Sequence, residues 1–459
     1  MVKVLPIETP TLGDRSYLVH DGQVAVVVDP QRDTDRINAL ARREGVRISH
    51  VAETHIHNDY VSGGLALSRA TGAAYLVNGA DPVRFAREPV GDGDVIDVSP
   101  AMRIRVVATP GHTFSHLSYV LTADGEVAGA FTGGSLLFGS TGRPDLLGPA
   151  HTVTLARAQH ASARRLADEL PDSAQVFPTH GFGSFCAATQ AAATASTIGR
   201  EKKLNAALTL GEEAYVETLL AGLDAYPAYY AHMGPANLAG PAVPDLSPSA
   251  SADPEQIRRR IAAGEWVVDL RDRVAFAAGF VPGTFSFPLD GSFASYLGWI
   301  LPWGTPLTLL GETPEQVARA QRELARIGID RLAAAAAGGP GQWSGGAPLA
   351  RIRLTRFGEL ASAGRNVVVL DVRRDLEWAA GHVAGAVHIP FSDLPARVGE
   401  IPAGEVWVYC RTGYRAMVAA SILAAAGRRV VSIDDEFDHA GKAGLTLARP
   451  DGPAEESTR

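Results

Sequence analysis

The stretch ETHIHNDYVSGG, residues 53–64, places two histidines and an aspartate within five positions, His55-Ile-His57-Asn-Asp59. Other short β-rich runs in the first 240 residues, such as QVAVVVDP and MRIRVVATPGH, also end in loops that carry Asp or His. An α/β scaffold usually carries its chemistry on polar loops at strand ends. The stretch therefore predicts an α/β domain with a metal site, and it leaves open whether that site holds one ion or two.

Length and composition define the broad class of protein. At ~150 residues per domain, 459 residues suggest about three domains. Apolar residues make up 46% and charged residues 20%, and the net charge of −8 offers no basic surface to nucleic acid or anionic lipid. The first residues lack the apolar region of a signal peptide, and no apolar run is long enough to span a bilayer. We expect a cytoplasmic protein that binds neither nucleic acid nor membrane and forms a homo-oligomer, either a dimer or a tetramer.

Two stretches rich in Pro, Gly, Ser and Ala divide the chain. GPAVPDLSPSASADP (240–254) is typical of a linker, and AGGPGQWSGGAPLA (337–350) is either a linker or the loop-rich end of a domain. We therefore expect one domain in residues 1–242, a second in 252–350 and a third in 351–459.

The second and third predicted domains are copies of one unit. VVDLRDRVAFAAGFVPGTFSFP, ending at Pro288, aligns without gaps on VLDVRRDLEWAAGHVAGAVHIP, ending at Pro390. A period near 100 residues is too long for a solenoid and indicates two copies of one domain. In each copy apolar runs alternate with helical periodicity, which predicts an α/β domain with a parallel sheet.

The third domain carries a cysteine in a reactive setting. In VWVYCRTGYRAMVAASIL, Cys410 follows a buried strand and precedes a helix that begins near Arg415. Loop amides, the positive end of the helix dipole and the guanidiniums of Arg411 and Arg415 all favour a thiolate, so Cys410 is predicted to be a nucleophile. The alternative is a buried structural cysteine.

This segment resembles the active-site loop of the rhodanese sulfurtransferases. LDVRRDLEWAAGHVAGAVHIP matches the upstream D-x-R…E…GH-I-x-GA-x-x-IP pattern of that family, so the resemblance covers about the last hundred residues. It implies that Cys410 carries a persulfide sulfur stabilised by Arg411 and Arg415. The loop residues that would form the cradle are Thr412, Gly413 and Tyr414.

The middle copy has no nucleophile at the matching position. Gly311 stands where Cys410 is expected, and it is followed by ETPEQ in place of an arginine-bearing loop. This copy resembles a degenerate rhodanese module kept for packing or docking.

Candidate metal ligands in the first domain follow in a recognisable order. They are His55, His57 and Asp59 in one loop, His112 in ATPGHTFSH, and His180 in VFPTHGFGSFC. With VVVDP (26–30), they resemble the ligand pattern of the metallo-β-lactamase fold, an αββα sandwich. Any single histidine is more often an ordinary residue, but this ordered set on strand-end loops indicates a metal site.

Two departures favour one ion over two. Binuclear hydrolases of this fold use H-x-H-x-D-H, and here Tyr60 replaces the last histidine. At the bridging position, where the family has Asp in TGD, this chain has Gly134. A binuclear hydrolase of the glyoxalase II type is therefore disfavoured.

The surrounding segments narrow the resemblance. ETHIHNDYVSGG, GRPDLLG (142–148), THGFGSFC (179–186) and YPAYYAHMGPANLAGP (226–241) are similar to persulfide dioxygenases fused to tandem rhodanese domains. That resemblance implies one non-haem Fe(II) per chain and oxidation of a thiol persulfide to sulfite by O₂. The ligand set it implies is His55, His112 and the TGD aspartate, which this chain lacks.

Two interpretations of the altered ligand set stay open. In the first, His57 completes a site with His55 and His112, and the iron keeps open positions for persulfide and O₂. In the second, the site binds metal weakly or binds Zn²⁺, because imidazole ligands suit both metals.

Two further residues have both a functional and a structural interpretation. Cys186, six residues after His180, is either a thiol that handles sulfur or a small buried apolar side chain. Arg143 is either the partner of a substrate carboxylate or a member of a structural salt bridge.

Three hypotheses of function follow. The first is oxidation of a low-molecular-weight thiol persulfide at one iron, coupled to sulfane-sulfur transfer by Cys410. The second is a rhodanese-type sulfurtransferase whose first domain is catalytically altered or only binds. The third is a metal-dependent thioester hydrolase.

Overall fold

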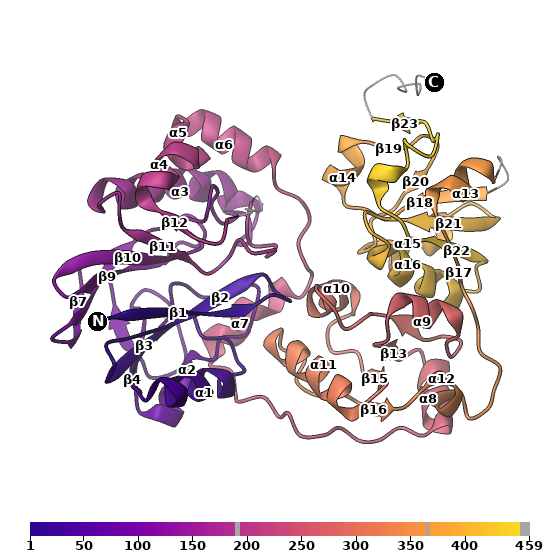
Figure 1. Ribbon diagram of the computed structural model, residues 1–459, viewed down its shortest axis with the longest axis horizontal. Helices are drawn as coiled ribbons and strands as arrows, with labels where there is room; N and C mark the ends of the chain where they lie inside the picture. The colour runs from indigo at the N-terminus through magenta and orange to yellow at the C-terminus, as the bar shows by residue number, and fades with distance from the viewer. Residues whose placement is uncertain (189–192, 364–366, 450–459) are drawn as a thin grey trace. The chain divides into compact units, whose positions relative to one another are not determined.

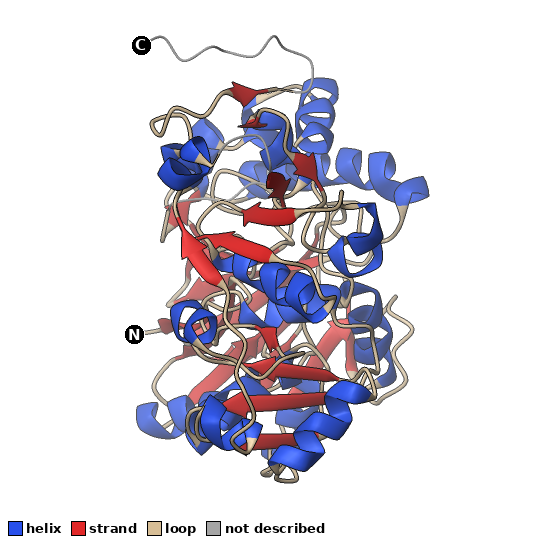
Figure 2. Ribbon diagram, turned by 90° about the vertical axis from the view of Figure 1, so that its right-hand side faces the viewer, coloured by secondary structure: helices blue, strands red, loops and turns tan. Residues whose placement is uncertain are grey.

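The protein is described by a computed structural model that covers residues 1–188, 193–363 and 367–449. Both helices and strands occur along the whole length of the described chain (Figures 1 and 2). The chain forms two compact units, of which the first contains Met1–Asp245 and Glu323–Ile329 and the second contains Leu246–Arg322 and Asp330–Arg459. None of the helices in these described ranges is long and apolar enough to cross a membrane.

The first unit contains two six-stranded sheets. One sheet has the order β1-β2-β3-β4-β5-β6 and the other has the order β12-β11-β10-β9-β8-β7. The strands of the first sheet are β1 (Lys3–Thr9), β2 (Asp14–His20), β3 (Val24–Val28), β4 (Arg47–Ala52), β5 (Ala74–Asn78) and β6 (Glu88–Val90). The strands of the second are β7 (Val95–Ser99), β8 (Met102–Ala108), β9 (Leu117–Ala123), β10 (Glu126–Gly133), β11 (Gln175–Pro178) and β12 (Ser196–Thr197).

Helices cover the outer faces of these two sheets, so the unit has four layers, α/β/β/α (Figure 1). The helices of this unit are α1 (Asp35–Glu44), α2 (Gly64–Thr71), α3 (Pro149–Glu169), α4 (Ile198–Leu204), α5 (Ala206–Thr209), α6 (Glu212–Ala221) and α7 (Tyr230–Ala239). Apolar side chains such as Val26, Val28, Ile104 and Tyr119 form one buried cluster of this unit. Strands with two buried faces are apolar along their whole length, which explains the run VAVVV in β3.

The pairing of the strands brings the polar loops together. β3, β4, β5 and β6 are parallel neighbours, and β10 is parallel to β11. The carboxyl ends of parallel neighbours lie at one edge of a sheet, which is where such folds bind ligands. The loops that carry Asp29, His55 and His180 follow β3, β4 and β11 at these edges.

The second unit contains two parallel sheets. One has the order β14-β13-β15-β16 and the other β17-β22-β21-β18-β20. Their strands are β13 (Trp266–Asp269), β14 (Phe285–Ser286), β15 (Leu307–Gly311), β16 (Ala334–Ala337), β17 (Arg353–Thr355), β18 (Val367–Asp371), β20 (Val387–His388), β21 (Glu405–Tyr409) and β22 (Val430–Ile433). The short strands β19 (His382–Val383) and β23 (Leu447–Ala448) form a separate antiparallel pair.

The helices of the second unit fall between these strands. Those up to residue 350 are α8 (Pro254–Ala262), α9 (Arg273–Ala278), α10 (Phe293–Ile300), α11 (Pro314–Arg326) and α12 (Pro340–Ser344). Those that follow are α13 (Phe357–Ser362), α14 (Asp375–Ala380), α15 (Leu394–Arg397) and α16 (Tyr414–Ala425), with short 3₁₀ turns at Val398–Glu400 and Phe437–His439. The last residues of α11 cluster with the first unit.

The two repeats have the same strand order, since β14-β13-β15-β16 corresponds to β20-β18-β21-β22. They also repeat one local contact, in which the arginine two residues after a strand pairs with the aspartate that ends it. The Arg271 and Arg373 guanidiniums lie 2.6 Å from the carboxylates of Asp269 and Asp371. The same sequence pattern therefore produces the same strand end twice.

The repeats share an apolar core. Phe276 and Phe280 of the middle repeat stack at 4.2 Å and pack with Met417 and Ala420 of α16. The Ser286 N–H also donates to the Ser421 hydroxyl. The division into domains at 252–350 and 351–459 stays a prediction, because both repeats, apart from Glu323–Ile329, belong to one compact unit.

Candidate metal centre and rhodanese loop

Asp29 anchors the histidine loop. The loop follows β4, and its Thr54 N–H and hydroxyl both donate to the Asp29 carboxylate at 2.7 Å. Asp29 follows the neighbouring strand β3 and is fully buried. A buried carboxylate is stable only with such donors, so Asp29 fixes the backbone from which His55 and His57 project.

In three histidines, the Nδ1 atom contacts a neighbouring oxygen, and the Nε2 atom faces a common point between the rings. Nδ1 of His55 lies 2.9 Å from the Thr54 hydroxyl, and Nδ1 of His112 lies 2.8 Å from the Arg143 carbonyl. Nδ1 of His180 lies 2.9 Å from Asp14. Outer contacts of this kind orient metal-binding histidines and fix their tautomer.

The remaining nitrogens of these histidines converge. His55, His112 and His180 offer ligand atoms that all lie within 4.8 Å of one another, and Nε2 of His55 lies 3.5 Å from Nε2 of His180. Among the described residues, the buried Nε2 of His112 has no hydrogen-bond partner. An unpaired buried nitrogen is costly unless a ligand satisfies it, so this set fits a metal ion.

His57 turns its ring the other way. Its Nε2 lies 3.2 Å from Asp29 and 3.3 Å from Glu53, and 3.0 Å from the Tyr60 hydroxyl. Within the described part of the chain its buried Nδ1 has no partner, and His57 groups with Asp59 and His180 as a second possible ligand set. The predicted set of His55, His57 and His112 therefore stays a prediction, and the structure adds His180 to the candidates.

Burial and neighbouring charges separate the pKa values of these histidines. Burial lowers the pKa of His55 well below its usual value and that of His112 to about 3, so both rings are neutral. Burial also acts on His57, but Asp29 and Glu53 outweigh it and raise its pKa to about 9. Neutral imidazole is the form that binds metal, so His55 and His112 are prepared for it.

His180 lies between two carboxylates. Its Nδ1 is 2.9 Å from Asp14 and 3.2 Å from Asp59, and these two charges outweigh burial and raise the pKa of His180 to about 10. One oxygen of Asp59, Oδ1, is buried and unpaired among the described residues. Asp59 thus orients His180 and still offers an oxygen toward the cluster.

The His112 ring lies against the backbone of Gly134, in the space that a side chain at residue 134 would need. A Cβ at residue 134 would lie 2.3 Å from the His112 ring, much closer than side chains approach one another. An aspartate at this position therefore cannot be accommodated unless His112 moves. The position of the His112 ring is therefore compatible with glycine at residue 134 and not with the aspartate of the TGD motif.

His116 belongs to the site but was not among the predicted residues. Its ring stacks on His55 with centroids 4.9 Å apart, and its Nε2 accepts a hydrogen bond from the Gly134 N–H. The signal was present in the sequence, because His116 follows His112 at the start of β9 in GHTFSH. Only the packing shows that it supports His55.

Arg143, the predicted partner of a substrate carboxylate, is already paired with a carboxylate of the protein. Both Nε and Nη2 of Arg143 lie 2.7 Å from the Asp145 carboxylate, and Nη2 also donates to the Asp224 carbonyl. The guanidinium lies 4.5 Å from the Tyr226 ring centre. These contacts favour the structural interpretation of Arg143, which ties three segments together beside the metal cluster.

Cys186 is fully buried near the same cluster. Its pKa is raised well above the usual value, first by burial and then by the charges of Asp59 and Asp14. A thiol held in its protonated form is a weak nucleophile. The geometry therefore supports the interpretation of Cys186 as a buried apolar side chain, and its functional role stays a prediction.

In the C-terminal repeat, Cys410 lies directly after β21 and before α16, as the sequence predicts. Its Sγ accepts a hydrogen bond from the Gly413 N–H at 3.1 Å, and the side chain is 1% exposed. Gly413 has φ +96°, and a Cβ there would lie 2.2 Å from Asp434. Only glycine permits this backbone, which turns a loop amide toward the sulfur.

The two arginines of the loop have different surroundings. Both Nη atoms of Arg415 donate to the Glu377 carboxylate, at 2.6 and 2.8 Å. Burial raises the pKa of Glu377, but the contact with Arg415 outweighs it and lowers that pKa to about 2. Arg411 and Thr412 are exposed. Arg415 therefore holds the loop through Glu377, and Arg411 is the more accessible cation.

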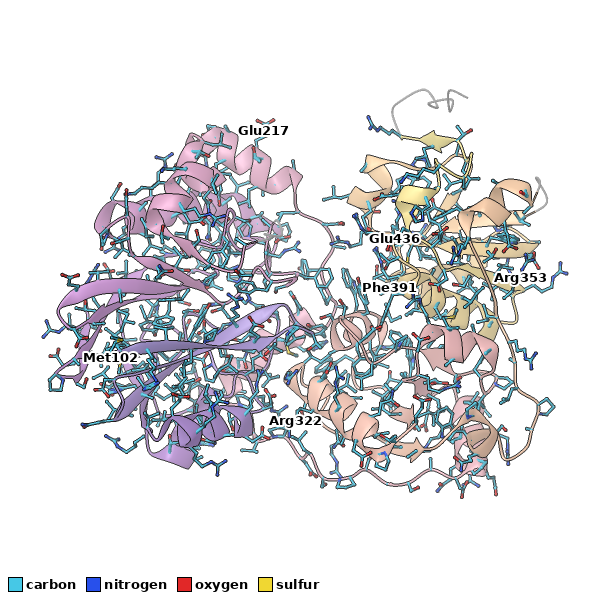
Figure 3. The ribbon with its side chains drawn as sticks, viewed as in Figure 1. Met102, Glu217, Arg322, Arg353, Phe391 and Glu436 are labelled. Carbon is cyan, nitrogen blue, oxygen red and sulfur yellow. The ribbon has the colours of Figure 1, made fainter. Side chains whose placement is uncertain are left out.

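Aromatic side chains of the middle repeat contact the residues around this loop. Tyr296 of α10 lies 5.3 Å from Tyr414 and 5.0 Å from Phe391 between ring centres, and Trp299 lies 5.3 Å from Phe391. Phe391 is labelled in Figure 3. The Tyr414 hydroxyl donates to the Pro288 carbonyl. The middle repeat thus contributes to the wall around Cys410.

The loop of the middle repeat is filled by its own side chain. Gln316 accepts a hydrogen bond from the Glu312 N–H and donates to the Leu270 carbonyl. A Cβ at Gly311 would lie 2.8 Å from Val317. Because Gln316 occupies a loop amide and no thiol stands at residue 311, this repeat has no sulfur-carrying group at the matching position.

Comparison with known proteins agrees with this geometry. The metallo-beta-lactamase superfamily matches residues 12–180, and the rhodanese-like domain matches residues 357–439. Human mitochondrial persulfide dioxygenase ETHE1 is 29% identical over 213 residues, which cover 46% of this chain and 75% of that protein. A hydroxyacylglutathione hydrolase of Maricaulis maris is 31% identical over 188 residues, 40% of this chain and 68% of that protein.

One solved structure matches more of the chain than the first unit alone. A metallo-beta-lactamase from Staphylococcus aureus subsp. aureus COL is 29% identical with a TM-score of 0.66, and the match covers 73% of this chain and 98% of that one. The chain belongs to the metallo-β-lactamase superfamily and carries a rhodanese-like domain in residues 357–439. The predicted fold class and the predicted fusion are confirmed, and the degenerate middle module stays a prediction.

Proposed function

We propose that the chain oxidises a low-molecular-weight thiol persulfide at one metal ion and transfers sulfane sulfur through Cys410. The observation that carries the first half is the convergence of His55, His112 and His180, together with the unpaired Nε2 of His112. The similarity to a persulfide dioxygenase supports the substrate class.

The proposed ion is Fe(II), held by the Nε2 atoms of His55, His112 and His180. His57 Nδ1 and Asp59 Oδ1 lie in the overlapping ligand set and are the further candidate donors. Iron bound there would supply the redox chemistry with O₂. The overall change is RSSH + O₂ + H₂O → RSH + SO₃²⁻ + 2H⁺, in which the outer sulfur is oxidised and O₂ is reduced.

The chain's own groups prepare this reaction. Thr54, the Arg143 carbonyl and Asp14 hold the three Nδ1 atoms, so the imidazoles keep their orientation. His116 supports the ring of His55 by stacking. Positioning of this kind lowers the cost of binding a metal and leaves room for the substrate.

Sulfur transfer is assigned to Cys410. The Cys410 sulfur would attack the outer sulfur of a donor such as thiosulfate, form Cys–S–S⁻ and release sulfite. A second thiol would then take that sulfur, which yields a thiol persulfide and restores the cysteine. The Gly413 amide and the exposed Arg411 would stabilise the anionic sulfur.

Metal content and O₂ uptake of anaerobically purified protein test the oxidation. We expect about one iron per chain, and O₂ uptake with the persulfides of glutathione or N-acetylcysteamine. His112→Ala and His180→Ala should lose both, whereas His439→Ala, at an exposed histidine, should lose neither. Protein without iron that consumes no O₂ on any persulfide would falsify the proposal.

Two other functions predict different results from the same protein. A sulfurtransferase with an altered first domain would show thiosulfate:cyanide transfer that Cys410→Ser abolishes, and no thiol-dependent O₂ uptake. A thioester hydrolase, favoured by the Maricaulis maris relative, would bind two Zn²⁺ and hydrolyse S-lactoylglutathione. Tyr60 and Gly134 stand against the second ion, because neither supplies the carboxylate or imidazole of a binuclear site.

A further inference from the structure

A cavity of about 430 Å³ opens beside the histidine cluster. Ile56 and Asn58 of the histidine loop line it on one side, and Thr113, the residue after His112, lines it next to them. The candidate ligands are not part of the lining, but Ile56, Asn58 and Thr113 are their direct neighbours in the chain, so the cavity borders the loops that carry them, and we take it as the approach of a substrate. This inference deepens the proposed function and rests on it for the identity of the reacting group.

The wall of this cavity is mainly apolar. Leu146 and Leu147 lie on one side, and Tyr226, Tyr230 and Leu238 from the segment around α7 also line it. At the rim, Phe114 is 51% exposed and Leu147 is 37% exposed. Large apolar side chains exposed at the mouth of a pocket are typical of a site for an apolar ligand.

The charges around the cavity do not suit an anion. Among the described residues, its lining contains no lysine, arginine or histidine, and its one ionisable carboxylate is Asp81. Arg87 donates to the Asp81 carbonyl and is not part of the lining. The Arg143 guanidinium lies 4.5 Å from the ring centre of the lining residue Tyr226 and is paired with Asp145.

We propose that this cavity binds a thiol carrier with no carboxylate near its thiol, such as an amide-linked or alkyl thiol, and selects against carriers of the glutathione type. A carboxylate that enters an apolar wall loses its hydration, and the described lining offers no lysine, arginine or histidine side chain in return. Asp81 adds like-charge repulsion. An uncharged amide carrier loses less hydration and gains the apolar contacts.

A matched pair of persulfides tests this selection. Those of N-acetylcysteamine and N-acetylcysteine differ by one carboxylate, so their kcat/KM values for O₂ uptake by the full-length, iron-loaded protein compare that group alone. We expect the uncharged persulfide to be favoured at least about tenfold, because a desolvated charge without a partner costs more than one factor of ten. Equal values, or a preference for the carboxylate, would overturn the inference.

A binding measurement separates this inference from the proposed function. The S-methyl thioethers of the same two molecules cannot form persulfides, and their dissociation constants are measured by calorimetry on the same protein. If no persulfide is oxidised but the uncharged thioether binds at least about tenfold more tightly, the proposed function fails and the selection stands. If no persulfide is oxidised and the thioethers bind equally or not at all, both fail.

A cation added at the rim should weaken or abolish the selection. Leu147→Lys places an ammonium at a partly exposed position of the cavity and should lower the preference about tenfold or more. Leu204→Lys is the matched control, because Leu204 is 60% exposed and does not line the cavity. If Leu147→Lys keeps the wild-type preference, the selection does not arise in this cavity and the inference is wrong.

Discussion

Replacing Glu377 by glutamine tests how the Cys410 loop is held. Glu377 belongs to α14, and its carboxylate binds both Nη atoms of Arg415, which is buried in the first turn of α16. The variant would leave a buried guanidinium without its counter-charge. We expect α16 and the loop before it to lose stability and Cys410 to lose sulfur-transfer activity.

The size of the effect follows from the pKa of Glu377. That pKa falls from 4.5 to about 2, since Arg415 outweighs burial, and ~1.4 kcal/mol per pKa unit gives about 3.5 kcal/mol. Breaking a buried ion pair by removing one partner costs ~3–5 kcal/mol, which agrees. Because the folded-state pKa is lowered, this contribution is complete above pH 4.5 and is lost as the pH falls toward 2.

Hydrogen exchange of the α16 amides measures the effect locally, because a chain of two compact units need not unfold in one step. Glu359→Gln is the control, since Glu359 forms an exposed pair with Arg353 in the same repeat, and we expect no change in α16 exchange. The opening free energy calculated from exchange after correction for the intrinsic rate should fall between pH 4.5 and 2 in the wild type and should lose this pH dependence in Glu377→Gln. Exchange rates that match those of Glu359→Gln would refute the reasoning.

Three further variants test the metal centre and the shared core. Gly134→Asp brings a Cβ to 2.3 Å from the His112 ring, so the amount of metal bound per chain should fall. Metal content is measured by atomic emission spectroscopy of the purified protein. A content equal to or above that of the wild type would contradict this. Tyr60→His restores one ligand of the binuclear motif, but Gly134 still lacks the bridging carboxylate, so we expect the content to stay at one ion per chain. Phe276→Ala removes a buried ring between the two repeats and should lower the free energy of unfolding of the second unit, followed by its own transition in urea, by about 3–5 kcal/mol. A loss no larger than that of an exposed substitution such as Val274→Ala would show that the repeats do not share this core.

Much of the architecture could be predicted from local patterns. The apolar runs that end in Asp29, in the histidine loop and in Cys410 are strands followed by loops, as expected. Short motifs specify backbone conformation over a few residues, and parallel strands bring their carboxyl ends to one edge. That is why the fold class, the histidine cluster and the position of Cys410 before a helix follow from the sequence.

The choice among candidate ligands could not be predicted in this way. His55 and His57 are two residues apart, yet the structure turns His57 Nε2 toward Asp29 and Glu53 and brings His55 to His112 and His180. The direction of each ring depends on which oxygen binds its other nitrogen. The oxygen at His55 is that of the adjacent Thr54, but those at His112 and His180 come from Arg143 and Asp14, which are far away in the chain. The spacing of the histidines carries no information about these distant partners.

Arg143 and Arg415 show the same limit. Both are cations near a predicted site, and the sequence favours each as a partner for a substrate or a sulfur anion. In the structure Asp145 occupies the first and Glu377 the second, 38 residues away along the chain. Whether a charge is available to a ligand depends on its tertiary partners.

By itself the sequence determined which chemical groups the protein has: a histidine-rich loop without a TGD carboxylate, one cysteine in a rhodanese-like loop, and a second copy without a thiol. Only the tertiary structure decided which nitrogens face one another, which guanidiniums are occupied, and that the cavity beside the histidines is apolar. The physical reason is that residue type sets what a group can bind, whereas burial and long-range contacts set what it does bind.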